Sequence, residues 1–283
     1  MNDKCAVEIE RLLGEGVTAL TPVAGGEINL SYSAELRDGR RLFVKTHTFP
    51  VSAMYIREVD GLALLQEARA LRIPKVLAVS ERLLVLEWIE TSQPTRSFDE
   101  TFGRGLATLH CMSLPTFGLA QDNFLGSLPQ INVPLPAWHT FYAERRIRPL
   151  ALLAYARKLI DTALLARIES LCERLDQLCG PSEPIARLHG DLWSGNVMCD
   201  ETGNPVLIDP AVYGGHREVD LAMLRLFDSP SARFFAAYEE LYPLNPGAAE
   251  RVSLYQIYPL LAHVCLFGKS YVSSLTTALS NYE

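Results

Sequence analysis

The sequence predicts an α+β chain of two lobes, in which a small antiparallel sheet precedes a larger, mostly helical part. Short runs with strand-like alternation, joined by turn residues, fill the first part of the chain, whereas apolar residues recur at helical spacing through most of the rest. The polar segment 91–94 separates these two patterns. We therefore expect a first lobe over residues 1–90 and a second lobe over residues 91–283.

The composition is that of a globular protein with a large core, because 48% of the 283 residues are hydrophobic and 21% are charged. A net charge of −7 and the lack of any block rich in lysine or arginine argue against a nucleic-acid partner. The first residues carry charges where a secretory signal would be apolar. The longest apolar run, around residues 259–267, is too short to span a bilayer.

The six cysteines show no CxxC spacing. Buried thiols in a reducing compartment explain them better than disulfides or a zinc site. We therefore expect a cytoplasmic protein without a membrane partner, and the sequence leaves open whether it is a monomer or a homodimer.

The first lobe is expected to open with a short amphipathic helix, followed by three strands. These elements are predicted at residues 6–13, 17–23, 30–36 and 41–46. Asp38-Gly39 between the last two strands is a strong hairpin signal. Gly25 and Gly26 lie between the first two strands, where a glycine-rich turn can bring backbone N–H groups close to phosphate oxygens. A tight turn without a ligand explains the glycine pair equally well.

Lys45 is predicted to point over the sheet on the same face as Phe43, because side chains alternate along a strand. A helix beginning near Ser52 places Glu58 one turn before Leu62, so the Glu58 carboxylate should face inward. An inward carboxylate needs a cation, and Lys45 is the obvious candidate. Such a pair orients the phosphate-contacting lysine of a kinase. The alternative is two solvated surface charges.

Two more strands, over residues 76–79 and 83–86, would complete a sheet of about five. Glu87-Trp88-Ile89 follows and leads into the polar segment between the lobes. A nucleotide base would fit in a crease at this point. The carbonyl of Glu87 and the N–H of Ile89 would then be its hydrogen-bond partners.

The second lobe is predicted to consist mainly of helices. They are expected at residues 98–110, 136–143 and beyond, 161–179, 218–227, 231–241 and 248–267. His110 is expected to be a hydrogen-bonded histidine at a helix end. The irregular stretch from 117 to 136 is long for a compact lobe, and such loops are often functional. We expect residues 117–148 to face the substrate.

Two stretches carry the expected chemistry of the second lobe, residues 188–197 and residues 206–210. Asp191 lies on a tight loop, Asn196 follows it closely, and Asp209 ends a short apolar strand. Phosphoryl transfer requires an Asp beside the attacking hydroxyl, and an Asn and an Asp that hold the magnesium bridging the nucleotide phosphates. Each piece alone is an ordinary loop feature, but their order favours the catalytic loop and metal-binding strand of a protein-kinase-like fold.

Two glycines, Gly190 and Gly195, would allow the loop around Asp191 to bend tightly. Asp220, in the first turn of a later helix, either accepts backbone N–H bonds from this loop or favours the dipole of its own helix.

These segments resemble the fructosamine kinase (ketosamine 3-kinase) family, which belongs to the wider aminoglycoside phosphotransferase-like, protein-kinase-like fold. The resemblance covers nearly the whole chain. Its most specific parts are Leu-Trp-Ser-Gly-Asn at residues 192–196 and Asp-Pro-Ala-Val-Tyr-Gly-Gly at residues 209–215. Further segments that carry it are Gly25-Gly26-Glu27-Ile28-Asn29, Phe43-Val44-Lys45, Arg57-Glu58 and the stretch from 117 to 132.

The resemblance implies an ATP-dependent kinase that uses Mg²⁺ and phosphorylates the 3-hydroxyl of a ketose joined to an amine. The acceptor would be a small-molecule or protein-bound ketosamine, either a fructosamine or a ribulosamine. The 3-phosphate makes the adduct unstable, so that it breaks down and frees the amine. Such an activity repairs early glycation.

Carried over residue by residue, the resemblance makes Asp191 the catalytic base and gives magnesium to Asn196 and Asp209. The nucleotide would be bound by Gly25, Gly26, Lys45, Glu58, Glu87, Trp88 and Ile89. Trp193, beside the base, is a candidate platform on which the sugar stacks, with packing within the loop as the alternative.

Glu27 marks a departure from some relatives, which carry a cysteine in the glycine-rich loop and respond to oxidation through it. We therefore do not expect a redox switch here. A carboxylate at this place is locally unfavourable beside phosphates unless it points away.

Three other functions stay open at this point. A kinase of the same fold acting on an aminoglycoside, a choline-like compound or another small alcohol is the nearest. A nucleotide-binding module without catalysis is disfavoured because Lys45, Asp191, Asn196 and Asp209 are all present. A metal-dependent hydrolase built on His189 and Asp191 ranks last, because no other histidine cluster supports it.

Overall fold

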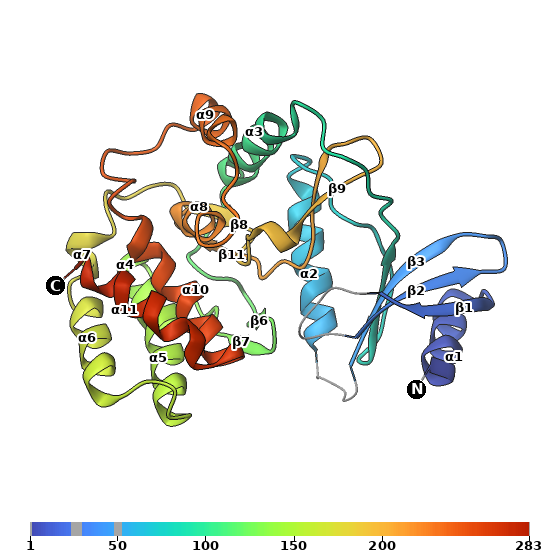
Figure 1. Cartoon of the computed structure of the whole chain (residues 1–283), viewed down its shortest axis with the longest axis horizontal. Helices are drawn as coiled ribbons and strands as arrows, with labels where there is room; N and C mark the ends of the chain where they lie inside the picture. The colour runs from blue at the N-terminus through green and yellow to red at the C-terminus, as the bar shows by residue number, and fades with distance from the viewer. Residues whose placement is uncertain (1, 24–29, 48–52, 283) are drawn as a thin grey trace.

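A five-stranded antiparallel sheet forms the N-terminal part of the computed structural model, which describes residues 2–23, 30–47 and 53–282. The strand order is β1-β2-β3-β5-β4 (Figure 1). The strands are β1 (Val17–Pro22), β2 (Leu30–Leu36), β3 (Arg41–Thr46), β4 (Val76–Val79) and β5 (Leu83–Glu87). The sheet agrees closely with the strands predicted from the sequence.

Each face of the sheet packs against a different helix, α1 (Asn2–Leu13) or α2 (Met54–Glu67). Val44 and its cross-strand partner Val85 belong to the cluster that contains Ile9 of α1. The next residue of each strand points the other way, because side chains alternate across a sheet. Lys45 therefore shares the α2 face with its partner Leu84, as the alternation predicts.

Helices make up most of the remaining chain. They are α3 (Phe98–Cys111), α4 (Trp138–Phe141), the π-helical segment η1 (Tyr142–Ile147), α5 (Arg148–Ala156), α6 (Thr162–Cys172), α7 (Leu175–Leu178), α8 (Glu218–Leu224), α9 (Ala232–Leu241), α10 (Val252–Phe267), the 3₁₀ turn η3 (Lys269–Tyr271) and α11 (Val272–Ser280). The hydrophobic side chains of α10 lie within the larger core cluster, which also takes in α5, α6 and α11 (Figure 1).

Three short antiparallel strand pairs lie among these helices. They are β6 (Asn123–Leu125) with β7 (Leu128–Gln130), β8 (Ala186–Leu188) with β11 (Tyr213–Gly215), and β9 (Val197–Cys199) with β10 (Pro205–Leu207). The 3₁₀ turn η2 (Ser194–Asn196) leads directly into β9. The last two pairs bring together the two stretches that carry the sequence motifs.

Several helices differ in extent from the sequence prediction. The helix predicted over 161–179 is divided into α6 and α7, although Asp161 does cap its start by accepting a hydrogen bond from the Leu164 N–H at 2.8 Å. The stretch predicted to be irregular contains the β6–β7 pair, and α11 was not predicted. All of these elements are short, and periodicity is least informative for short segments.

The cysteines are all free, as predicted, but they are not all buried. Cys5, Cys172, Cys179 and Cys265 are buried, whereas Cys199 is half-buried and Cys111 is exposed. Among the described residues, no helix combines the length and the hydrophobicity that crossing a membrane would require.

Candidate active site

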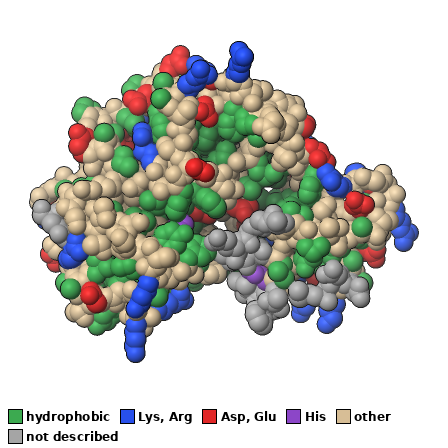
Figure 2. Space-filling model, viewed as in Figure 1, with side chains coloured by type: hydrophobic (Ala, Val, Ile, Leu, Met, Phe, Trp, Pro, Cys, Tyr) green, Lys and Arg blue, Asp and Glu red, His purple; other side chains and the backbone are tan. Residues whose placement is uncertain are grey.

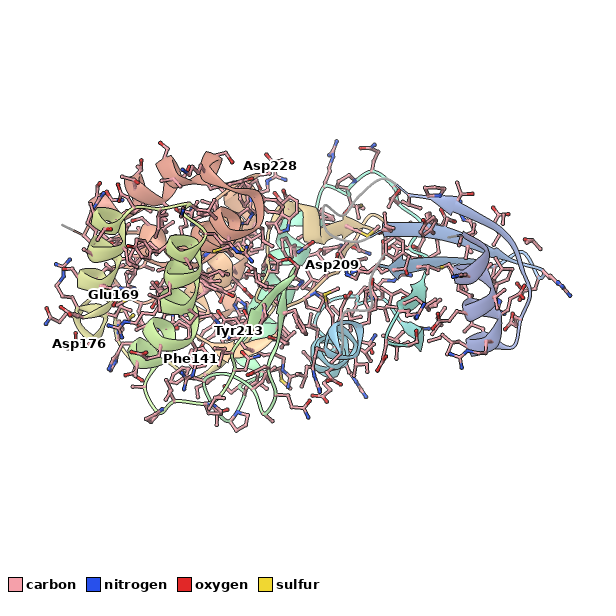
Figure 3. All side chains as sticks on the ribbon, turned by 90° about the horizontal axis from the view of Figure 1, so that it is seen from below. Phe141, Glu169, Asp176, Asp209, Tyr213 and Asp228 are labelled. Atoms are coloured by element: carbon pink, nitrogen blue, oxygen red, sulfur yellow. The ribbon has the colours of Figure 1, made fainter. Side chains whose placement is uncertain are left out.

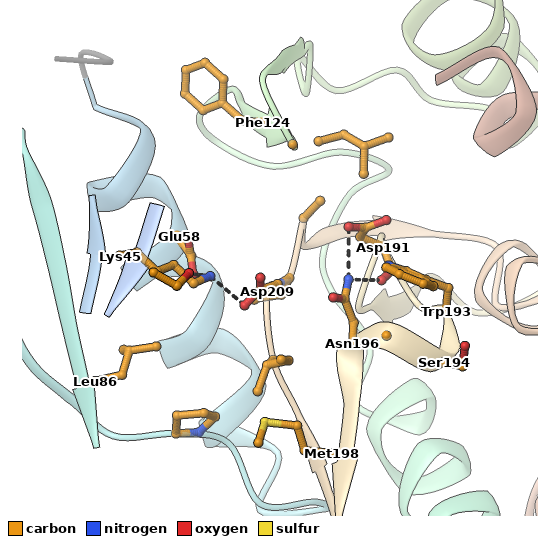
Figure 4. A pocket seen from close by; sticks show the side chains of 18 of the residues that line it. Lys45, Glu58, Leu86, Phe124, Asp191, Trp193, Ser194, Asn196, Met198 and Asp209 are labelled. Carbon is orange, nitrogen blue, oxygen red and sulfur yellow. Dashed lines mark hydrogen bonds and ion pairs between the residues drawn. The ribbon is translucent and has the colours of Figure 1, made fainter. Parts of the chain in front are cut away.

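A cavity of about 980 Å³ lies between the sheet and the helical part and contains the predicted site. Figure 2 shows the hollow between the two halves of the molecule, with carboxylate side chains among hydrophobic ones. Lys45, Glu58, Asp191, Asn196 and Asp209 all line this cavity. The structure thus brings together side chains that lie far apart in the sequence (Figure 4).

Lys45 is 2% exposed and sits between two carboxylates. Its Nζ lies 2.6 Å from Oε1 of Glu58 on α2 and 2.5 Å from Oδ1 of Asp209 (Figure 4). Burial lowers the pKa of Lys45, but the charges of Asp209 and Glu58 outweigh burial and raise it above its ordinary range. Lys45 is therefore a fixed cation that points into the cavity, and the predicted pair with Glu58 is present.

A buried carboxylate holds the backbone of the loop that carries Asp191. Asp220 on α8 accepts hydrogen bonds from the backbone N–H groups of His189 at 2.7 Å and Gly190 at 3.0 Å. His110 lies beside the same carboxylate, with Nε2 3.2 Å from Asp220 Oδ2 and Nδ1 2.8 Å from the Tyr238 hydroxyl. The structure thus decides between the two roles considered for Asp220, and His110 is the hydrogen-bonded histidine that we expected.

Gly190 allows the sharp turn before Asp191. Its φ of +83° is a conformation that side chains other than glycine rarely adopt, and a Cβ atom there would come within 2.1 Å of the Ala211 carbonyl oxygen. His189 donates from Nε2 to the Ile208 carbonyl at 2.9 Å and accepts from the Asp191 N–H through Nδ1. Burial lowers the pKa of His189, which favours the neutral ring. The ring connects the loop to the strand that leads to Asp209 through these two hydrogen bonds.

Asp191 faces the cavity from this loop. Burial raises its pKa to about 7, and the negative charges of Asp209 and Asp220 act in the same direction while the Asn196 amide opposes them. Asn196 donates from Nδ2 to the backbone carbonyl of Asp191 at 2.8 Å and to its Oδ2 at 3.0 Å. The amide therefore fixes the carboxylate that we expect to act as a base.

Asn196 and Asp209 flank the ends of the paired strands β9 and β10. The Ile208 N–H donates to the Asn196 carbonyl at 3.1 Å, which keeps the two residues side by side. Asp209 has a φ of +55°, an unusual backbone for a residue with a side chain and one that is common at functional sites. Within the described part of the chain, the Asn196 amide oxygen and the second Asp209 carboxylate oxygen accept no hydrogen bond, so two hard oxygen atoms are left for a cation.

Arg72 ties this strand pair to the first part of the chain. Its carbonyl accepts a hydrogen bond from the Leu207 N–H at 3.0 Å, and its guanidinium pairs with Asp200 and Glu201 beyond β9. These contacts hold the end of β10 at a fixed place relative to the sheet. They explain how Asp209 reaches Lys45 across the cavity.

The segment expected to bind the base also lines the cavity, through Glu87, Trp88 and Ile89. The guanidinium of Arg41 stacks 4.4 Å from the centroid of the Trp88 ring. Gly25 and Gly26, together with Glu27, lie outside the described residues, but Val23 and Ser31 on either side of that segment both line the cavity.

Trp193 follows Asp191 by two residues, lines the cavity and is 37% exposed. Its ring packs so tightly over Gly195 that a Cβ atom at residue 195 would come within 2.3 Å of ring carbons. Gly195 in the Leu-Trp-Ser-Gly-Asn segment is therefore required by the position of Trp193.

The helical side of the cavity comes only in part from residues 117–148, the stretch that we expected to face the substrate. Of residues 117–148, the cavity is lined by Asn123–Gly126 alone, and the remaining wall is formed by parts of 223–228 and 259–271. The β6–β7 pair is held in place because Asn123 donates to the Val212 carbonyl at 2.8 Å and Gln130 donates to the Ala211 carbonyl at 3.1 Å. The wall residues of α10 were missed because their helical spacing is also that of core residues.

Comparison with known proteins places this site in context. A family model described as fructosamine kinase matches residues 1–282. A probable ketoamine kinase of Enterococcus faecium is 36% identical over 92% of this chain and 94% of its own length. A chloroplastic protein-ribulosamine 3-kinase of Arabidopsis thaliana is 34% identical over 96% of this chain and 86% of its own length.

Solved structures are also similar to this chain. A crystal structure from Thermobifida fusca, whose protein is provisionally named fructosamine-3-kinase, has a TM-score of 0.91 and 38% identity, and the match covers 98% of this chain and 97% of that one. An aminoglycoside phosphotransferase, APH(2″)-IIa, shares the fold at 13% identity and a TM-score of 0.68. The protein-kinase-like fold that the sequence predicted is confirmed.

Proposed function

The chain belongs to the fructosamine kinase family, and we propose that it transfers the γ-phosphoryl group of ATP to the 3-hydroxyl of a ketosamine. The observation that carries the proposal is the single cavity in which Lys45, Asp191, Asn196 and Asp209 meet in a chain matched over residues 1–282 by that family. The acceptor would be a fructosamine or a ribulosamine, either as a small molecule or attached to a protein side chain.

ATP is proposed to lie along the sheet side of the cavity. Glu87, Trp88 and Ile89 would hold the base, and the glycine segment at Gly25 and Gly26 would cover the phosphates. Lys45, held between Glu58 and Asp209, would contact the phosphate oxygens as a fixed positive charge. This arrangement supports a division of the chain into a nucleotide-binding lobe over residues 1–90 and a catalytic lobe over residues 91–283.

Asp191 is proposed to be the catalytic base. The acceptor oxygen forms a bond to the γ-phosphorus while the bond from that phosphorus to the bridging oxygen breaks, so that ADP leaves and Asp191 takes the hydroxyl proton. A pKa raised to about 7 by burial is suited to this role, since a base is most effective when its pKa lies near the working pH. Positioning and charge neutralisation provide most of the rate enhancement.

Asn196 and Asp209 fit a magnesium ion. Each directs an oxygen atom into the cavity that makes no hydrogen bond to the described residues, and hard oxygen ligands of this kind are what Mg²⁺ prefers. The contribution of the ion, when bound, is to neutralise negative charge on the phosphates. Trp193 would stack on the sugar from the other side of Asp191.

The product would be a ketosamine 3-phosphate, which is unstable and releases its amine. The consequence for the cell would be repair of early glycation. A cytoplasmic location stays a prediction from the free thiols.

A substrate screen tests this function against its rivals. ADP formation by the purified protein would be measured with fructosyl-lysine, ribulosyl-lysine, choline and an aminoglycoside, each with and without magnesium. We expect magnesium-dependent turnover with one or both ketosamines. Turnover with choline or the aminoglycoside alone would favour the same-fold rival, and binding of ATP without ADP formation in the presence of any acceptor would favour a non-catalytic nucleotide-binding module.

A further inference from the structure

The acceptor is proposed to bind at the helical side of the cavity, which we call the acceptor side. This side carries a cluster of aromatic rings beyond Trp193. Phe227 lies 6.0 Å from Trp193 and 4.9 Å from His263, measured between ring centroids. His263 in turn lies 5.4 Å from Phe267 and 5.0 Å from Tyr271. All five residues line the cavity, and we call them the aromatic wall.

The aromatic wall differs from an ordinary hydrophobic core in its exposure. Trp193, Phe227 and Phe267 are 37%, 38% and 38% exposed, although the large aromatic rings of one cluster are usually mostly buried. An exposed apolar patch inside a cavity is typical of a ligand-binding surface. The wall therefore presents ring faces and edges to whatever enters beside Asp191.

Asp228 follows Phe227 directly and lines the same cavity. Figure 3 shows Asp228 at the edge of the helical part, on the side toward Asp209. Its carboxylate is exposed and forms neither an ion pair nor a hydrogen bond with the residues that the structure describes. It is therefore available to a ligand.

The charge of this side of the cavity is negative. Among the described lining residues from Asn123 onward, there is no lysine or arginine. Asp209 is paired with Lys45, whereas Asp191 and Asp228 form no ion pair with the described residues. The cations that line the cavity, Lys45 and Arg57, belong to the sheet side, where the phosphates are expected. A cationic acceptor is therefore favoured on the helical side and an anionic one is disfavoured.

A ketosamine carries such a cation next to its sugar. Its secondary amine is largely protonated near neutral pH, as alkyl amines are. A protonated amine pairs with a carboxylate and is also attracted to the faces of aromatic rings. Both kinds of partner lie together at Phe227 and Asp228.

We propose that Asp228 and the aromatic wall form a subsite that recognises the protonated amine of the acceptor, so that the kinase selects cationic ketosamines over uncharged or anionic ketose derivatives of the same shape. The inference rests on the proposed function and adds the feature of the acceptor that is recognised. Asp228 acts as a specificity residue and takes no part in the transfer of the phosphoryl group.

A matched pair of acceptors tests the subsite. In 1-deoxy-1-propylamino-fructose the amine is charged, whereas in 1-deoxy-1-propylthio-fructose a sulfur atom replaces the nitrogen and removes the charge. We expect wild-type protein to prefer the amine, and Asp228→Asn to lower kcat/KM for the amine about tenfold through KM. The same variant should leave kcat/KM for the thioether unchanged. Glu81→Gln, which removes an exposed carboxylate outside the cavity, is the control and should change neither value.

The ratio of kcat/KM for the two acceptors distinguishes the possible outcomes. An amine-to-thioether ratio in Asp228→Asn equal to that of wild type would overturn the subsite while the proposed function stands. Equal loss of activity on both acceptors would indicate a structural effect and would likewise overturn it. Absence of turnover with either acceptor in wild type would reject the proposed function and the subsite together. Asp228→Lys provides a second variant, in which we expect the preference for the amine to be lost or reversed.

Discussion

Asp220→Asn provides a demanding test of how the catalytic loop is held. The carboxylate of Asp220 is fully buried and accepts hydrogen bonds from two backbone N–H groups, those of His189 and Gly190. Asparagine keeps one acceptor oxygen but places an NH₂ group against the other backbone donor. The substitution thus removes the charge, loses one hydrogen bond and leaves a buried N–H without a partner.

The expected size of the effect follows from these losses. A hydrogen bond to a charged group contributes about 1.5–3 kcal/mol, and a buried donor left unpaired costs about 1–3 kcal/mol. Because asparagine retains part of the interaction, we expect the free energy of unfolding to fall by about 2–4 kcal/mol. In a chain of this size that corresponds to a decrease in Tm of roughly 4–8 °C. Displacement of Asp191 by the relaxed loop should lower kcat about 100-fold.

Thermal unfolding followed by circular dichroism, together with steady-state kinetics, measures both quantities. Asp60→Asn is the matched control, because Asp60 forms an exposed pair with Arg57 at 2.7 Å and its loss should change stability by less than about 0.5 kcal/mol. If Asp220→Asn were as stable and as active as Asp60→Asn, Asp220 could not be the support of the loop.

Three further predictions address other parts of the site and the fold. Lys45→Met should lower kcat/KM for ATP by roughly 100-fold, because it removes a buried cation and leaves the carboxylates of Glu58 and Asp209 facing each other; an unchanged ATP dependence in steady-state kinetics would contradict this. Gly195→Ala should raise KM for the ketosamine more than KM for ATP, since a Cβ atom would come within 2.3 Å of the Trp193 ring and displace it; equal changes in both KM values would argue against a sugar-contacting role. The pKa of His216 is lowered by burial to about 4, so the neutral ring stabilises the fold fully above pH 6.5 and this stabilisation, about 3 kcal/mol, is lost as the pH falls from 6.5 toward 4. Urea unfolding across this range should show a smaller pH dependence in His216→Gln than in wild type, and identical slopes would refute the assignment.

Local patterns in the sequence predicted the nucleotide side of the site well. Alternation along one strand and helical spacing along α2 were sufficient to pair Lys45 with Glu58, and the structure places their charged atoms 2.6 Å apart. A strand and a helix each impose a fixed side-chain periodicity, so an inward charge on one element indicates a partner on the other. The additional contact of Lys45 with Asp209 depends on the tertiary fold and could not be predicted from spacing.

The acceptor side was much less visible in the sequence. His263 and Phe267 lie four residues apart on α10, which is the spacing of a buried helical stripe, and no local signal distinguishes a stripe that faces a cavity from one that faces a core. The strands β6 and β7 contain three residues each, too few for alternation to be recognised. Asp220 was compatible with two roles, because only the tertiary structure shows whether a first-turn carboxylate meets a backbone from another element.

A single-turnover measurement with Asp191→Ala tests the central claim most directly. Enzyme in excess over γ-labelled ATP, with a ketosamine and magnesium, would be followed for transfer of label to the sugar, while thermal unfolding and nucleotide binding are measured on the same sample. We predict that transfer is abolished while the Tm and the affinity for ATP stay near wild type. Transfer at a near-normal rate in this variant would contradict the assignment of Asp191 as the base that receives the acceptor proton.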